Sequence, residues 1–400
     1  MRMIHATLGL MILITFGGTA YAEEFKLSYS CINCHQDRYN EWERSMHSLA
    51  IRDPVFETAY LKAIQSNPEY RQYCLGCHSP TTAVTKDYGL TKSISIEGVT
   101  CSFCHSVSGI ENNTYIFNQS NPMFGPYSNS ITDAHASAYS VLLTKSEFCA
   151  GCHEFSLNGI PISETFSEWK AGPYSREGKQ CQDCHMETKT GVAAKNGPVR
   201  DKVYQHFWYG GHSGQFLEKA FGLESNVEKK GNRVKVTLNI TNDNVGHKVP
   251  SGLPSRKVVL SFRANDETGK EIFSDQRVYA KTLVDQYGNE VLDFWKATAV
   301  SKDNRIGPRE SRTEVFEFDA PGDIKELVTS ATLTYQLEAE ILTSTEETMN
   351  VEIARSLSTT KLEAFVPEAA ATPKETPAPG WVAGFIAVMA AVLLSRMRRQ

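Results

Sequence analysis

The cysteines of this chain occur as five pairs with one spacing, and a histidine follows each pair directly, giving the pattern C-x-x-C-H five times. Two thiols at this spacing can add to the two vinyl groups of one haem, while the next residue brings an imidazole to the iron. The five motifs are Cys31, Cys34 and His35; Cys74, Cys77 and His78; Cys101, Cys104 and His105; Cys149, Cys152 and His153; and Cys181, Cys184 and His185.

Two other chemistries use closely spaced cysteines. A single pair could be half of a zinc site or a redox-active dithiol. Neither needs a histidine after every pair, and the five motifs use all ten cysteines of the chain, so none is left over for a disulfide. The sequence therefore predicts five c-type haems as cofactors.

The motifs lie close together in the sequence, between residues 31 and 185. With so few residues per motif, the polypeptide cannot bury enough side chains of its own, and the porphyrins must supply much of the apolar interior. The haems should then be close neighbours. Because electron tunnelling falls off exponentially with distance, we expect a conducting set of haems and not five isolated centres.

The remaining histidines could complete the iron coordination. The chain has eleven histidines, and apart from the motifs and His5 near the N-terminus, five remain. Five irons and five free imidazoles predict haems with two histidine ligands each and no open position, which favours electron transfer over catalysis. These five predicted ligands are His47, His135, His206, His212 and His247.

His247 belongs to a segment that could equally be a tight loop between strands. If it serves only that loop, one iron stays open. The alternative function is then a multihaem reductase acting on nitrite, hydroxylamine or a sulfur oxyanion at that iron.

The chain divides into parts of different character. Residues 23–220 contain the motifs and little sustained periodicity, which predicts a mostly helical and irregular pentahaem domain. Within residues 226–365, the segments 233–241, 313–318 and 331–337 alternate polar and apolar residues, as β-strands do. Turn signals separate them, so we expect an α+β fold that ends in an antiparallel, immunoglobulin-like β-sandwich.

Both ends of the chain look like targeting segments. Residues 1–22 combine a basic start, an apolar run and a small-residue cleavage site, which is typical of a signal peptide. Residues 366–379 form a Pro- and Thr-rich linker, and residues 380–400 an apolar run with a basic end, which predicts a C-terminal membrane anchor or a sorting tail. We therefore expect export, with anchoring at the outer face of the cytoplasmic membrane or at the cell surface.

The C-terminal segment resembles the sorting signals of archaeal surface proteins, although Trp381 stands where that pattern has Phe. The net charge of −5 is mixed along the chain and includes no basic stripe, which argues against a nucleic-acid partner. Redox proteins or an extracellular electron acceptor are the partners that we expect.

The first motif, followed by Tyr39, Trp42 and His47, resembles the opening of the multihaem cytochromes with a cytochrome c-552/c-554-type domain. The later motifs and the segment around Gly246 and His247 are similar to that family as well, over residues 28 to 262. The resemblance implies an electron-transfer protein of respiratory chains, with His47 as a haem ligand and an appended β domain.

Some relatives in that group polymerise into filaments. Those filament formers carry four haems where this chain has five motifs, so filament assembly is not carried over, and a homo-oligomer or filament stays open. Five-haem nitrite reductases are also relatives, but their active haem has Lys in place of the motif histidine. All five motifs of this chain keep histidine.

Overall fold

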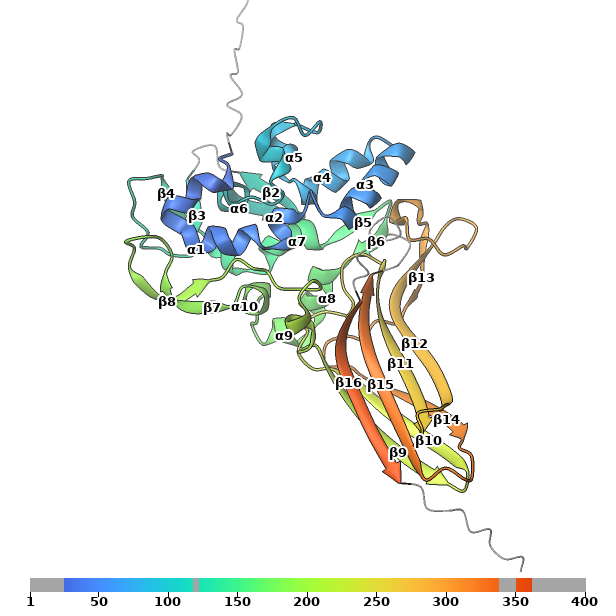
Figure 1. Cartoon of the computed structure of the whole chain (residues 1–400). Helices are drawn as coiled ribbons and strands as arrows, with labels where there is room; N and C mark the ends of the chain where they lie inside the picture. The colour runs from blue at the N-terminus through green and yellow to red at the C-terminus, as the bar shows by residue number, and fades with distance from the viewer. Residues whose placement is uncertain (1–24, 118–121, 338–349, 362–400) are drawn as a thin grey trace, which may run out of the picture.

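The chain is described by a computed structural model that covers residues 25–117, 122–337 and 350–361. The predicted signal peptide, linker and C-terminal segment lie outside the described residues. Figure 1 shows two parts: short helices and hairpins gather at one end, and long strands extend from them as a sandwich. Within the described ranges, no helix is both long and apolar enough to span a bilayer.

The N-terminal part is built from short helices, and each of the five motifs lies on one of them. In α1, α4, α6, α7 and α10 the motif histidine falls within or at the end of the helix. The helices are η1 (Ser28–Cys31), α1 (Ile32–Glu43), α2 (Met46–Leu49), α3 (Pro54–Ser66), α4 (Tyr70–His78), α5 (Thr81–Thr85), η2 (Ser93–Ile96), α6 (Cys101–Ser106), η3 (Val141–Thr144), α7 (Glu147–His153), α8 (Thr165–Ala171), α9 (Pro173–Arg176), α10 (Cys181–His185) and α11 (Gly214–Leu217).

Local capping explains where some of these helices begin. Asp53 accepts a hydrogen bond from the Val55 N–H at 3.2 Å, and Pro54 occupies the first turn of α3, where its missing N–H costs nothing. Thr100 accepts one from the Phe103 N–H at 3.1 Å, so α6 begins at the first cysteine of its motif. The caps therefore fix the start of the third motif helix.

Four small two-stranded sheets connect the helices, three antiparallel and one, β3 with β4, parallel. The sequence reading of a helical and irregular domain did not include them. Their strands are β1 (Val107–Glu111), β2 (Thr114–Phe117), β3 (Met123–Gly125), β4 (Ser137–Tyr139), β5 (Phe155–Leu157), β6 (Ile160–Ser163), β7 (Thr188–Val192) and β8 (Val199–Tyr204).

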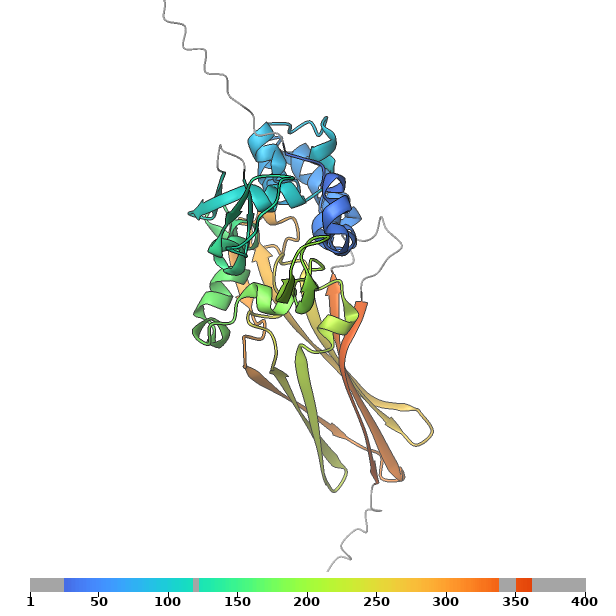
Figure 2. The same ribbon diagram turned by 90° about the vertical axis from the view of Figure 1, so that its left-hand side faces the viewer.

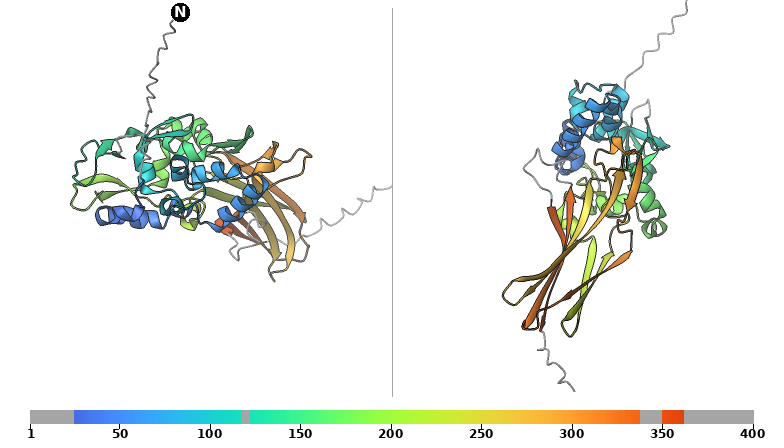
Figure 3. Two further views of the ribbon diagram at one scale, coloured as in Figure 1. Left: turned by 90° about the horizontal axis from the view of Figure 1, so that it is seen from above. Right: turned by 90° about the vertical axis from the view of Figure 1, so that its right-hand side faces the viewer.

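The C-terminal part is a sandwich of two antiparallel sheets, which Figure 2 and the right-hand view of Figure 3 show as two layers. One sheet has the order β14-β10-β9 and the other β13-β12-β11-β15-β16. The strands are β9 (Phe221–Lys230), β10 (Arg233–Asn242), β11 (Arg256–Asp266), β12 (Glu271–Val284), β13 (Ala299–Asp303), β14 (Ser311–Asp319), β15 (Glu326–Leu337) and β16 (Asn350–Lys361), with the short helix η4 (Phe294–Lys296) between β12 and β13.

Alternation of side chains builds the sandwich core. Along β10 the inward residues are fully buried while their neighbours face outward. Phe262 of β11 stacks on Phe316 of β14 at 4.5 Å between ring centroids, and Phe273 stacks on Phe318 at 4.8 Å. The two sheets are thus joined by aromatic contacts across one apolar layer.

The predicted fold class is confirmed: the chain is α+β, with helices first and antiparallel sheets after them. The three predicted strand segments lie inside β10, β14 and β15. The first strand of the sandwich begins at Phe221, five residues before the expected boundary at 226.

Candidate haem-binding site

One large cavity, of about 1570 Å³, lies inside the N-terminal part and extends to the near end of the sandwich. It is lined by all ten motif cysteines and all five motif histidines. His47, His135, His206, His212 and His247 line it too. The fold therefore brings every residue that the sequence predicts to hold haem into one connected space.

The motif helices explain how each pair of thiols reaches this space. In a helix, residues at i, i+3 and i+4 lie on the same face, so the two cysteines and the histidine of one motif point together. All ten cysteines are free thiols. Two unpaired thiols and an adjacent imidazole are what attachment of one c-type haem requires.

Backbone carbonyls fix the orientation of most motif imidazoles. Because a carbonyl oxygen only accepts hydrogen bonds, Nδ1 of these rings must carry the proton, and Nε2 keeps its lone pair for a metal. The Nδ1 contacts run from His35 to Ala193 at 3.0 Å, from His78 to Ala50 at 2.8 Å, from His105 to Phe124 at 2.6 Å and from His185 to Tyr209 at 2.5 Å.

Three of the other histidines are held the same way. In each of them Nδ1 donates to a backbone carbonyl. His135 donates to Ala136 at 3.1 Å, His206 to Tyr204 at 3.0 Å and His247 to Lys248 at 2.9 Å. His47 differs, because its Nδ1 is buried without a hydrogen-bond partner.

Four motif histidines each have a second imidazole at nearly the same distance. Metal–imidazole bonds are about 2.0 Å long and each ring centre lies about 1.2 Å further, so two imidazoles on one metal have centres about 6.4 Å apart. The observed centroid distances fit an iron between the rings: 6.5 Å for His35 with His135, and 6.4 Å for His105 with His206, His153 with His47, and His185 with His247.

Burial keeps these rings neutral. It lowers the pKa of His47 and His206 to about 3, and that of His153 and His247 to about 4. A neutral imidazole is the form that binds a metal, so these four rings can act as ligands at neutral pH without first losing a proton.

His78 and His212 are different. In the described structure the ring stacked on His78 is Phe56, at 3.8 Å and 14°, and His212 is not brought opposite it as the other four partners are. Both histidines share the charges of Asp53 and Arg256 as neighbours. The second motif is therefore the place where the opposite ligand is least defined.

Thiols from different motifs touch one another. Cys101 hydrogen-bonds to Cys31 and lowers the pKa of that thiol to about 6, and Cys149 does the same to Cys181, whose pKa falls to about 7. Cys77 likewise hydrogen-bonds to Cys152 and lowers its pKa. These contacts join motif 1 to motif 3, motif 4 to motif 5, and motif 2 to motif 4.

The β domain contributes directly to the cavity through the loop that carries His247. A buried ion network holds this loop against α8. Arg305 binds Glu168 of α8 at 2.7 Å and Asp303 at 2.8 Å, and Glu168 accepts a hydrogen bond from the Lys248 N–H at 3.2 Å. His247 is thus positioned by both parts of the chain. The predicted ligand that does not face a motif histidine is His212, and the iron left without a second imidazole would be that of His78.

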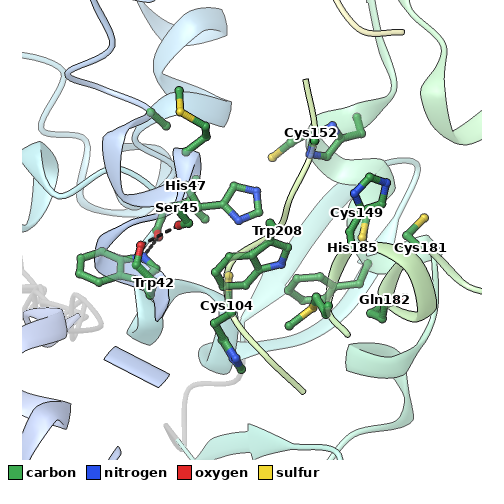
Figure 4. A pocket seen from close by; sticks show the side chains of 18 of the residues that line it. Trp42, Ser45, His47, Cys104, Cys149, Cys152, Cys181, Gln182, His185 and Trp208 are labelled. Atoms are coloured by element: carbon green, nitrogen blue, oxygen red, sulfur yellow. Dashed lines mark hydrogen bonds between the residues drawn. The ribbon is translucent and has the colours of Figure 1, made fainter. Parts of the chain in front are cut away.

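Sequence reasoning missed the residues that hold the ligands. The carbonyl groups that anchor Nδ1 carry no side-chain signal, and Phe56, Arg256 and Trp208 stood out by no periodicity. Trp208 lies in the interior of the cavity beside His47 (Figure 4). The run of aromatic residues after His206 was the one available hint.

Comparisons with known proteins agree with this geometry. Residues 30–106 match the family model described as cytochrome c554 and c-prime. The structure is similar to that of a penta-heme cytochrome c552 from Thermochromatium tepidum, with 23% sequence identity and a TM-score of 0.68, over 84% of this chain and 99% of that chain. Residues 30–106 therefore resemble that family, and the chain shares its fold with the penta-heme cytochrome c552.

A glycosyl hydrolase family 2 member from Bacteroides cellulosilyticus also matches, at 11% identity over 36% of this chain and 14% of that chain, but a TM-score of 0.19 supports no inference. No curated protein matches the sequence.

Bound haem would supply this chain with irons that gain and lose one electron each. The residues present fit that group: thiols for the covalent bonds, Nε2 atoms for the irons and an apolar cavity to exclude water. The motif cysteines and histidines would hold the haems, and the second imidazole of each pair would close the opposite side.

Proposed function

We propose that this chain is a multihaem cytochrome c of the c554/c552 type, which binds five c-type haems and transfers electrons through them. The observation that carries the proposal is the convergence of all five C-x-x-C-H motifs on one cavity, together with the second imidazole that faces four of the motif histidines. Rings on both sides of an iron leave no position for a substrate, which suits a carrier of electrons.

The contacts between motifs support a continuous path. Thiol contacts link motif 1 to motif 3 and motifs 2 and 5 to motif 4. Trp208 contacts both His47 and His206, which are the second imidazoles of the motif 4 and motif 3 sites. In this arrangement an electron that arrives at motif 1 passes through motif 3 to motif 4. From motif 4 it can continue either to motif 2 or to motif 5.

A second candidate function is reduction of nitrite, hydroxylamine or a sulfur oxyanion at the motif 2 site. It rests on the observation that no second imidazole faces His78 as one faces each of the other four motif histidines. Arg256 lines the cavity near His78 and His212 and could attract an anion, while Asp53 and His212 could supply protons.

We further propose that the protein is exported and works at the outer face of the cytoplasmic membrane or at the cell surface, held by its C-terminal segment. Its partners would be redox proteins or an extracellular electron acceptor. These proposals rest on the sequence of the two ends, and a homo-oligomer or filament stays open.

Carbon monoxide separates the two candidate functions, because it binds only a ferrous iron with an open or weakly held position. The reduced holoprotein should bind none if all five sites are closed by histidine. One equivalent of bound carbon monoxide per chain, lost when Cys74 and Cys77 are both replaced with serine so that motif 2 holds no haem, would instead favour the reductase, and turnover of nitrite and hydroxylamine should then be measured.

A further inference from the structure

Trp208 is placed between two of the proposed haem sites. It lies in the segment between β8 and α11, and residues 206–213 all line the cavity. Its indole makes edge contacts with His47, at 4.5 Å and 62°, and with His206, at 5.0 Å and 79°. Figure 4 shows the indole inside the pocket, next to His47.

The backbone at Trp208 is unusual. Its φ of 45° lies in the left-handed region, which bulky residues rarely adopt because Cβ crowds the backbone. Such a conformation is unfavourable and persists only where surrounding contacts enforce it. The fold therefore holds this indole in place against a local preference.

The two imidazoles that Trp208 touches are anchored differently. His206 is fixed independently of the indole: its Nδ1 donates to Tyr204 at 3.0 Å, and its N–H donates to the buried carboxylate of Glu41 at 2.9 Å. His47 has no such anchor, since its Nδ1 is buried and unpaired. Its ring neighbours in the described structure are Trp208, at 4.5 Å between centroids, and His153, at 6.4 Å, so Trp208 is the nearer ring that can set the plane of the imidazole.

The ring planes reflect this difference. The interplanar angles are 28° for His35 with His135, 18° for His105 with His206 and 10° for His185 with His247, so three pairs are close to parallel. His47 and His153 are tilted by 58°. The tilted pair is the one whose second ring lacks a hydrogen bond and packs on Trp208.

We infer that Trp208 is a positioning residue that sets the plane of the His47 imidazole and so gives the motif 4 site an electronic character of its own. The inference rests on the proposed function, because it requires haem at motifs 3 and 4. In ferric haems with two imidazole ligands, the angle between the ligand planes sets the splitting of the iron d orbitals. Near-parallel planes give rhombic EPR signals, and strongly tilted planes give one with a larger maximum g value.

EPR of the oxidised holoprotein tests the inference. The wild type should show one strongly anisotropic low-spin signal beside the rhombic ones. In Trp208→Gly, which removes the indole and tolerates a positive φ, this signal should shift towards the rhombic group. The signal from the His105 and His206 site should stay where it is, because His206 keeps its hydrogen bonds.

Trp208→Phe keeps an aromatic ring and should give a smaller shift, while Trp295→Phe, at a tryptophan whose ring neighbour is Phe294, should give none. An unchanged anisotropic signal in Trp208→Gly would overturn the inference, and so would a wild type that lacks such a signal. Haem content by pyridine haemochrome on the same samples separates the outcomes: low content in the wild type counts against the proposed function, whereas full content with an unmoved signal counts against Trp208 alone.

Discussion

Replacing His247 with alanine tests whether the β domain completes the haem site. The imidazole of His247 lies 6.4 Å from that of His185, with only 10° between the ring planes. The loop that carries it is held by the buried network of Arg305 and Glu168. Removing the ring should therefore open one iron without releasing the loop.

The size of the spectral change follows from the pairing of His247 with His185. His185 keeps its hydrogen bond to Tyr209, so the motif 5 haem should stay attached and keep one protein ligand. One haem in five should change from low-spin to high-spin in the ferric state. Carbon monoxide bound by the reduced protein should rise by one equivalent per chain over the wild type.

The assay is a carbon monoxide titration followed by visible spectroscopy, repeated with added imidazole. Imidazole should enter the space left by the side chain and restore the low-spin spectrum. Asn244→Ala is the matched control, since Asn244 lies on the same loop and bonds Lys219 but faces no histidine ring in the described contacts. A His247→Ala protein that stays low-spin and binds no additional carbon monoxide would refute the pairing.

Three further predictions concern attachment, stability and pH. Replacing both Cys181 and Cys184 with serine should lower the intact mass by one haem and leave four, which mass spectrometry checks; an unchanged haem count would show that motif 5 carries none. Phe262→Ala should lower the free energy of unfolding by about 3–5 kcal/mol, because this side chain is fully buried between the sheets; urea denaturation measures it, and a loss below about 1 kcal/mol would contradict the packing. Burial raises the pKa of Asp303, but the bonds from Arg305 and Lys248 outweigh it and hold that pKa well below its usual range. The stability that Asp303 contributes should therefore be present at neutral pH and decline as the pH falls below about 4. Urea titrations at several pH values measure this decline. Asp303→Asn should abolish it, whereas the control Asp319→Asn, at an exposed carboxylate, should leave it intact.

The haem attachment residues could be predicted from the sequence because covalent chemistry fixes their spacing. The strands around Leu238, Phe316 and Leu333 were equally accessible, since one buried face imposes a period of two on the residues. Both signals are local. They need no knowledge of which parts of the chain meet in space.

The pairing of the imidazoles could not be predicted, because it depends on contacts between distant segments. His35 faces His135, one hundred residues away, and His47 faces the fourth motif and not the first, which is its neighbour in the sequence. His247 lay among strand signals, which concealed that its loop turns back towards α8. The aromatic run after His206 hinted that Trp208 lines the site, but its contacts with His47 could not be predicted, since its positive φ results from packing that the sequence does not display.

Counting the haems tests the central claim most directly. The chain should be produced in a host that attaches c-type haem, purified and measured by intact mass and by iron content. We predict a mass increase of five haems and five irons per chain. Fewer haems, or zinc in place of iron, would contradict the assignment of all five motifs to haem.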